Sequence, residues 1–380
     1  MKLRKSPLIL AAYALGAAAW LLSLAGCQAA PAAPTALSAA PQQSTAAAAG
    51  ATAGATAGAN GAATGSPAAP VEVRVQMIEL KGALNHPNAE LSGLAWYEDN
   101  LVLLPQYPQR MAASPGGALF RLSRRQLQDY LQDPSTGPLE PQPIPLLTGG
   151  VEDQASGFEG FEALGFSGRR VFLTIEAHGL GRMHGYVVSG EIAADLSEVR
   201  LDPAGLVEHP LQGKYSNKSD EALLLSGERL LTFYEVNGAQ YNPAPQAAQF
   251  DLALRLLDPL PFPNLEYRLT DAAGPDAQGR FWVINYFFSG DDDIRPQRDP
   301  LAEQYGQGPT HARYDVVERL VEFQLTPQGI QRTSTAPLQL ELAAGGEARN
   351  WEGLAWAPGW GFFLATDKYP TTLLGFIAYP

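Results

Sequence analysis

Five stretches of this chain repeat one short pattern, and two of them read Ser92-Gly-Leu-Ala-Trp-Tyr97 and Glu352-Gly-Leu-Ala-Trp-Ala357. Each stretch opens with a polar residue and runs through small and apolar residues into a tight turn and then an apolar strand. The opening residues are Ser92, Glu162, Glu221, Asp271 and Glu352. Internal repetition of this kind is typical of a modular β fold, in which each unit is one supersecondary element.

The pattern predicts a β-hairpin in every unit. Pro358-Gly-Trp360, for example, precedes the apolar run Phe362–Thr366, and its glycine supplies the positive φ that a tight turn needs. The second strand begins nine or ten residues after the opening residue in all five units. Longer stretches between the hairpins, such as Phe250–Leu256 and Val317–Leu325, read as outer strands.

Together these units predict an all-β propeller whose blades surround a central channel, because repetition around a ring hides the sheet edges. Only three strands follow the last opening residue, so we expect the alternating segment Val71–Leu80 to pair with the C-terminal blade and close the ring. We prefer five blades. Six are the alternative, because the fourth and fifth units are widely separated, and we interpret that excess as a long loop over Phe287–Ala312.

The N-terminal residues predict export and lipid attachment. Cations precede an apolar run in residues 1–26, which is typical of a signal peptide, and Leu24-Ala-Gly-Cys27 has the form of a bacterial lipobox. An ordinary signal peptide is the alternative. Residues 27–69 then hold the lipidated Cys27 and a disordered Ala/Thr/Gly linker. The prolines of this linker disfavour the alternative of an Ala-rich helix. Residues 70–380 form the propeller domain. We therefore expect an extracytoplasmic protein anchored by lipid to a bacterial membrane, at the outer membrane or cell surface.

Composition excludes several classes of function. Cys27 is the single cysteine, which rules out an intrachain disulfide and a cysteine nucleophile within the domain. The formal net charge of -13 argues against nucleic acid as a partner. No phosphate-binding loop, Gly-x-Ser-x-Gly elbow or His-Glu-x-x-His helix occurs, which disfavours the corresponding enzyme classes.

The opening residues are the candidate metal ligands. The first strand of each propeller blade lines the channel, so Ser92, Glu162, Glu221, Asp271 and Glu352 should meet in one ring. Four carboxylates at such short distances repel one another unless some are protonated or a cation lies among them. A hard ion satisfies this, with Ca²⁺ ahead of Mg²⁺ or Mn²⁺. The alternative is that these side chains bond backbone amides of the neighbouring blade.

A second set of polar residues follows the second strands: Gln106, Glu176, Glu235, Asn285 or Tyr286, and Asp367. Because the hairpins are short, both sets should open on one face. Here Glu176, Glu235 and His178 are candidate catalytic residues. Candidate cations for gripping the phosphate or carboxylate of a substrate are Lys214, Lys218, Lys368 and Arg295. The alternative for the acids and the histidine is that they are polar loop residues exposed to solvent. The alternative for the cations is that they only balance nearby negative charges.

The strand openings resemble those of the exported bacterial family named for the esterase-like activity of phytase, a phytase-like β-propeller family. The similar stretches are Glu90-Leu-Ser-Gly-Leu-Ala, Gly157-Phe-Glu-Gly-Phe-Glu-Ala-Leu, Ser219-Asp-Glu-Ala-Leu and Asn350-Trp-Glu-Gly-Leu-Ala-Trp. They are also similar to the strand starts of calcium-activated nucleotidases, which are apyrase propellers of five blades with calcium in the channel. That resemblance implies Ser92, Glu162, Glu221 and Glu352 as calcium ligands, whereas the fourth unit departs from it with Asp271-Ala-Ala-Gly.

The sequence thus predicts a membrane-anchored, metal-dependent hydrolase of phosphoesters or other esters. Ca²⁺ would polarise the ester oxygen, Glu176 or Glu235 would activate water, and a lysine would hold the leaving anion. The alternative is a propeller without catalytic activity that binds a glycan, a protein or a small ligand.

Overall fold

The computed structural model describes residues 70–111 and 116–379, and these residues are almost entirely β. The strands fall into sets of four, each running outward from the channel, and the outermost strands of the first two sets pair in parallel and join these sets into one sheet. The first two sets are β2 (Leu91–Tyr97), β3 (Asn100–Pro105), β4 (Ala118–Ser123) and β5 (Gln142–Leu147), then β6 (Phe158–Ser167), β7 (Arg170–Gly179), β8 (Arg182–Ile192) and β9 (Val199–Leu201). The next two are β11 (Asp220–Ser226), β12 (Arg229–Tyr234), β13 (Gln246–Asp251) and β14 (Leu256–Pro261), then β15 (Arg268–Ala273), β16 (Arg280–Phe287), β17 (Val317–Thr326) and β18 (Gly329–Arg332).

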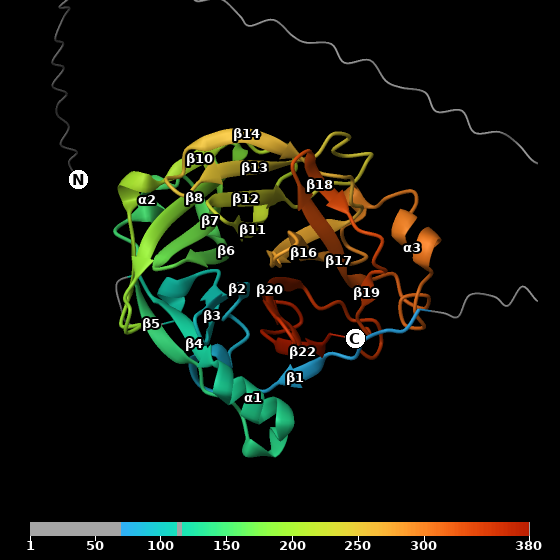
Figure 1. Ribbon diagram of the computed structural model, residues 1–380, viewed down its shortest axis with the longest axis horizontal. Helices are drawn as coiled ribbons and strands as arrows, with labels where there is room; N and C mark the ends of the chain where they lie inside the picture. The colour runs from blue at the N-terminus through green and yellow to red at the C-terminus, as the bar shows by residue number, and fades with distance from the viewer. Residues whose placement is uncertain (1–69, 112–115, 380) are drawn as a thin grey trace, which may run out of the picture. The chain divides into compact units, whose positions relative to one another are not determined.

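The last set is β20 (Trp351–Ala357), β21 (Gly361–Thr366), β22 (Leu374–Ala378) and β1 (Gln76–Ile78). Figure 1 shows these sheets arranged around a common centre, with β2, β6, β11 and β20 innermost. β15 is the corresponding edge strand of its own set and packs beside β11 and β20. Each innermost strand packs beside the innermost strand of the next set, and β20 packs beside β2. The predicted all-β propeller is therefore confirmed.

The N-terminal strand closes the ring as predicted. β1 pairs antiparallel with β22, and Gln76 lies opposite Phe376. The paired segment is shorter than the predicted Val71–Leu80, because its two ends bridge other parts of the ring. Val73 forms a parallel bridge with Leu340, and Leu80 forms one with Leu139.

Short elements decorate the outer edge. Two extra strands, β10 (Val207–His209) and β19 (Leu338–Gln339), pair with β8 and β17. The helices of the described residues are α1 (Arg124–Gln132), α2 (Val151–Gln154) and α3 (Pro300–Tyr305), with 3₁₀ turns at Gly82–Leu84, Pro108–Arg110, Pro134–Thr136, Pro203–Gly205 and Asp292–Ile294. Within the part of the chain that is described, none of the helices has the length and apolar character to cross a bilayer.

Two predicted segments can be compared directly. The stretch Phe287–Ala312 is indeed mostly loop and carries α3. The outer strand predicted over Phe250–Leu256 is wrong, because the chain turns there between β13 and β14. The Asp251 carboxylate accepts hydrogen bonds from the backbone amides of Ala253 and Arg255, which stabilise the turn.

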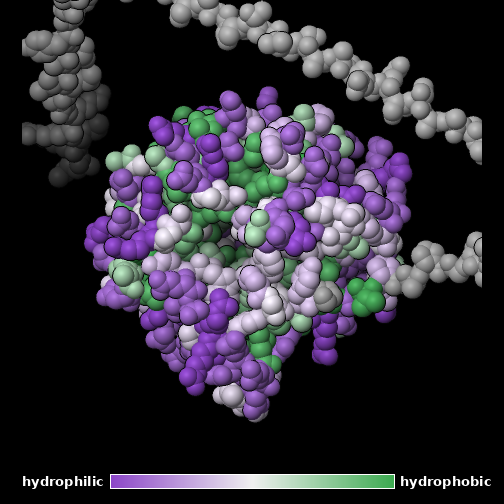
Figure 2. Space-filling model, in the orientation of Figure 1, coloured by the Kyte–Doolittle hydropathy of each residue, from purple (hydrophilic) through white to green (hydrophobic). Residues whose placement is uncertain are grey.

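The core lies between neighbouring sheets rather than at the centre of the ring. Separate buried clusters fill the wedges between successive sheets, for example around Phe233, Phe281 and Phe323, and around Trp282, Trp351 and Phe362. This packing leaves the centre free for polar residues. On the face drawn in Figure 2, hydrophilic residues cover most of the periphery and hydrophobic residues gather toward the middle.

Every innermost strand is irregular at the repeated opening position. The register of β2, β6, β11, β15 and β20 shifts there by one residue, which is the mark of a β-bulge. The small residue that follows is required by crowding near the axis, since a Cβ added at Gly353 would lie 2.9 Å from Leu94 Cγ of the next inner strand. The bulges re-aim the opening side chains, and so they decide which of them reach the channel.

Candidate functional site

A cavity of about 800 Å³ opens at the mouth of the channel where the innermost strands begin. Its walls are strongly acidic, with carboxylates from every part of the ring. The charged lining residues are Glu90, Glu159, Glu162, Glu176, Glu221, Asp291, Glu347, Glu352 and Asp367, with the cations Lys218, Arg268 and Lys368. Residues of both predicted sets line this one cavity, which agrees with the prediction that they open on one face.

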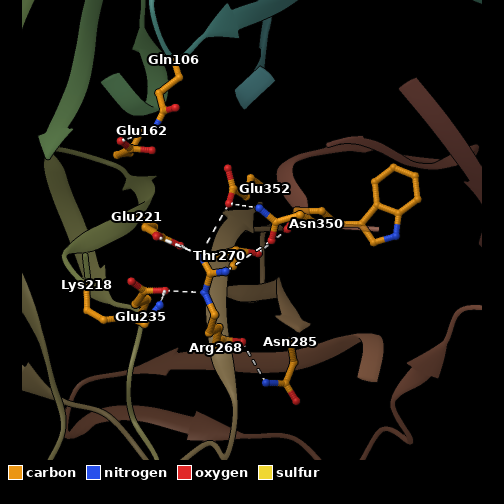
Figure 3. A network of polar contacts seen from close by, with 11 residues as sticks. Gln106, Glu162, Lys218, Glu221, Glu235, Arg268, Thr270, Asn285, Asn350 and Glu352 are labelled. Carbon is orange, nitrogen blue, oxygen red and sulfur yellow. Dashed lines mark hydrogen bonds and ion pairs between the residues drawn. The ribbon is translucent and has the colours of Figure 1, made fainter. Parts of the chain in front are cut away.

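The guanidinium of Arg268, at the start of β15, lies among the carboxylates (Figure 3). Its Nε donates to Glu235 Oε2 at 2.5 Å, and its Nη2 donates to both oxygens of Glu221 at 3.1 Å. Nη2 also reaches Glu352 Oε1 at 3.5 Å. Arg268 is only 6% exposed, so this ionic cluster is held away from bulk water, where charge pairing is strong.

Amide side chains complete the network around Arg268. Asn350 accepts from Arg268 Nη1 at 3.3 Å and donates to Glu352 Oε1 at 2.6 Å. On the opposite side Gln106 donates to Glu162 Oε1 at 3.0 Å. Burial, followed by the charges of neighbouring carboxylates, raises the pKa of Glu162 and Glu352 well above the ordinary range.

Two of the five predicted metal ligands do not enter the channel, so the prediction of a five-membered ring is wrong. Ser92 donates to the backbone carbonyl of Phe161 in the next inner strand at 2.6 Å. Asp271 accepts from the amides of Ala272 and Leu354 at 2.8 and 2.6 Å. Asp271 is therefore used as the alternative interpretation stated, in a bond to an amide of the neighbouring inner strand, whereas Ser92 bonds a carbonyl of such a strand.

The contacts also show why the fourth unit departs from the pattern. Thr270, not Asp271, falls at the bulge position, because Leu269 pairs with Asn285 and Ala272 with Val283. Thr270 donates to the carbonyl of Trp351 at 2.6 Å, as Ser92 does to Phe161. The aligned opening residues are thus two hydroxyls and three glutamates, and Asp271 stands one residue later.

The predicted calcium site does not fit these contacts. Glu221 and Glu352 are engaged by Arg268, and Glu162 by Gln106, so the remaining predicted ligands are not free. Among the described residues, no group of three or more His, Cys, Asp or Glu side chains is arranged to hold a metal ion. The positive charge that the sequence analysis assigned to calcium is supplied here by the chain itself, and calcium stays a prediction without a ligand set.

Of the second predicted set, some residues line the cavity and others do not. Gln106, Glu176, Tyr286 and Asp367 line the cavity. Glu235 is fully buried behind Arg268 and is not part of the cavity wall, so it orients the guanidinium instead of meeting a substrate. Asn285 donates to the carbonyls of Glu266 and Arg268 and serves the backbone.

Glu176, near the end of β7, is one of the acids of the site with an unpartnered buried oxygen. It is 4% exposed, and its Oε2 has no hydrogen-bond partner among the described residues. Burial, and then the charge of Glu235, raise the pKa of Glu176 to about 7, although Ser219 and Lys218 oppose this shift. An acid that titrates near neutral pH in a cavity is suited to transfer protons.

The predicted cations and the histidine are scattered. Lys218 approaches Glu235 Oε2 at 3.7 Å, and Lys368 approaches Glu90 Oε1 at 3.8 Å, both in the cavity wall. Arg295 pairs with Asp292 and Asp315 in the long loop. The remaining two candidates, Lys214 and His178, do not line the cavity either.

Sequence reasoning missed Arg268, Asn350, Phe288 and Tyr369. One signal was present in the sequence: a cation stands three residues before the opening residue in the last three units, as Lys218, Arg268 and Arg349. Two of these three cations do meet the central carboxylates. The predicted lipidation site, Cys27, the signal peptide and the whole linker lie outside the described residues.

Comparison with known proteins identifies no family for this chain. No protein-family model matches the chain, and no curated protein does. Among solved structures it is similar to glucose dehydrogenase (14% identity, 80% of this chain and 99% of that chain, TM-score 0.42) and to RS223 β-xylosidase (9%, 80% and 94%, 0.43). It is also similar to a hypothetical protein from Leishmania major (12%, 81% and 91%, 0.42). Similarity at this level carries no argument about activity, so the phytase-like family stays a prediction.

Proposed function

We propose that the cavity is the active site of a hydrolase that cleaves an ester or glycosidic bond with a pair of glutamates, Glu162 and Glu176. The observation that carries this proposal is the buried, unpartnered Oε2 of Glu176 in the wall of an open cavity. Glu162 lines the same cavity from the adjacent strand β6, and burial, followed by the charge of Glu176, raises the pKa of Glu162. Two such carboxyls favour a state with one proton between them.

That state provides both halves of an acid–base hydrolysis. The protonated carboxyl donates its proton to the leaving oxygen as the scissile bond breaks. The ionised carboxyl takes a proton from water as the water oxygen forms the new bond.

The charge of the cavity bears on the kind of ester. A phosphate dianion would meet nine carboxyls and three cations in the lining, and the predicted calcium ligands are occupied. We therefore favour uncharged or cationic substrates over phosphoesters. The extracytoplasmic location and the lipid on Cys27 are a separate proposal, supported by the lipobox sequence and tested by labelling with a radioactive fatty acid, with Cys27→Ala as the control.

The test is hydrolysis of p-nitrophenyl esters and glycosides by the purified full chain. We expect Glu162→Gln and Glu176→Gln each to lower kcat/KM by about 100-fold or more, because each removes a proton carrier. Glu191→Gln is the matched control, since Glu191 is exposed on β8 and pairs with Arg169.

Equal activity of the wild type and both variants would contradict the proposal. Cleavage of p-nitrophenyl phosphate that depends on added calcium would also contradict it and would support the metal-dependent alternative. Saturable binding of a glycoside without turnover would support the non-catalytic alternative.

A further inference from the structure

Several buried carboxylate oxygens around the cavity have no partner. Among the described residues, Glu176 Oε2, Asp291 Oδ2 and Asp367 Oδ1 accept no hydrogen bond, and all three residues line the cavity. Glu176 is 4% and Asp291 8% exposed. Leaving a buried polar atom unpaired is costly, so such atoms indicate a missing ligand group or proton.

These oxygens come from separate parts of the ring. Glu176 lies near the end of β7, Asp291 lies in the loop after β16, and Asp367 follows β21. No three acidic side chains of the described residues are grouped closely enough for one metal ion. A single small cation therefore cannot satisfy them together, whereas an extended ligand with several cationic groups can.

The mouth adds aromatic surface to this acidic wall. Phe288 and Tyr369 line the cavity and are 37% and 63% exposed, so their rings can be reached by a molecule in the cavity. The ring of Phe288 stacks at 6.3 Å on that of Tyr286, which is buried deeper in the same wall. Aromatic faces beside carboxylates attract ammonium groups and the carbon chains or rings that carry them.

We propose that the cavity binds a small ligand with two or more separated primary ammonium groups, which the carboxylates of Glu176, Asp291 and Asp367 receive while Phe288 and Tyr369 cover its carbon skeleton. Polyamines and glucosamine oligomers share this chemistry. The inference builds on the proposed function, since it names the class of substrate that the hydrolase would accept.

Isothermal titration calorimetry of the full chain tests the proposal with three probes: spermidine, a glucosamine trimer and the fully N-acetylated trimer. We expect at least one of the two amines to bind, and the neutral trimer to bind at least about 10-fold more weakly, which corresponds to one lost ion pair of about 1.4 kcal/mol. Binding of spermidine alone would assign a polyamine, and binding of the glucosamine trimer alone would assign an amino sugar.

Asp291→Asn keeps the shape of the side chain and removes its charge, so we expect it to weaken amine binding about 10-fold. Asp292→Asn is the matched control, because Asp292 is exposed and pairs with Arg295. The proposal is overturned if neither amine binds, if the acetylated trimer binds as tightly, or if Asp291→Asn binds amines like the wild type.

The two proposals fail separately. Turnover of a neutral p-nitrophenyl substrate without amine binding would overturn only the ligand class. Amine binding without turnover of any substrate would overturn only the hydrolase. Tighter binding of calcium chloride than of either amine, measured in the same calorimeter, would also count against the ammonium ligand.

Discussion

Replacing Arg268 with methionine should destabilise the protein by about 3–5 kcal/mol, because it removes one side of a buried ionic cluster and leaves the other side in place. Glu221, Glu235 and Glu352 would lose their shared donor. Burial already raises the pKa of Glu221 and Glu352 well above the ordinary range even with Arg268 present. Without it these carboxyls should take up protons, so the loss of stability should be smaller in acid than in alkali.

Urea unfolding of the wild type and Arg268→Met at several pH values measures this loss. Arg349→Met is the matched control, because Arg349 is equally buried but pairs with Glu318 outside the cavity. The control should also lose stability, but millimolar calcium should restore stability only to Arg268→Met, whose central carboxylates are freed. The wild type should be indifferent to calcium and to chelator.

A loss below about 1 kcal/mol for Arg268→Met at alkaline pH, in the range of an exposed ion pair, would refute this view of the cluster. A melting temperature of the wild type that falls in chelator would refute it in a different way. That result would mean that a metal ion, and not the guanidinium, neutralises the central carboxylates.

Three further changes test separate parts of the structure. The pKa of Glu176 is raised to about 7 from 4.5, so ionisation of Glu176 lowers the stability of the folded state as pH rises between these values. Glu176→Gln should therefore raise the free energy of unfolding by up to about 3 kcal/mol above pH 7 and leave it unchanged below pH 4.5. Urea titrations at both pH values would show this difference. Asp271→Ala should cost about 1–3 kcal/mol by leaving the Leu354 amide unpaired, yet leave amine affinity in calorimetry unchanged. Glu72→Ala should loosen the N-terminal segment, because Glu72 accepts bonds from His311 and Thr310, and faster hydrogen exchange at the Val73 amide would report it.

The Glu72 bonds also give this last contact a pH dependence of known sign. Burial alone would raise the pKa of Glu72, but the hydrogen bonds from His311 and Thr310 outweigh burial and lower it. The stabilisation is therefore present above the ordinary pKa of 4.5 and is lost as pH falls through the lowered value. Exchange at Val73 that shows no dependence on acid would contradict this contact.

The hairpins were predictable because their signals are local. A turn with glycine between two apolar runs fixes a hairpin whatever lies beside it, and β20 and β21 follow the predicted segments closely. The Phe250–Leu256 strand failed for the same local reason, since an Asp251 turn interrupts a run that looks continuous by hydrophobicity. The closing strand β1 was also predictable, because only three strands follow the last opening residue and the last unit therefore lacked one strand.

The direction of the opening side chains was not predictable, because it depends on bulges and on length. Ser92 and Thr270 are short and reach only the carbonyl of the neighbouring inner strand. The glutamates at the aligned positions of the other units are longer and extend into the channel. A one-residue shift at Asp271 cannot be detected in a pattern whose members share only small and apolar residues.

The identity of the central cation was unpredictable for the same reason, because it depends on which side chains point into the channel. Mutual repulsion of carboxylates requires a positive charge, and this requirement could be read from the sequence. Whether a metal ion or a side chain meets it depends on which residues face the axis in the two units without a glutamate. In the fourth unit the positive charge comes from Arg268, whose guanidinium donates directed hydrogen bonds to Glu221 and Glu235. A spherical ion has no such directional preference. Because Arg268 bonds to Glu221, Glu235 and Glu352 and to neither Glu176 nor Asp291, the unpartnered oxygens of these two acids in the cavity wall remain available, and this is the physical basis for expecting a cationic ligand there.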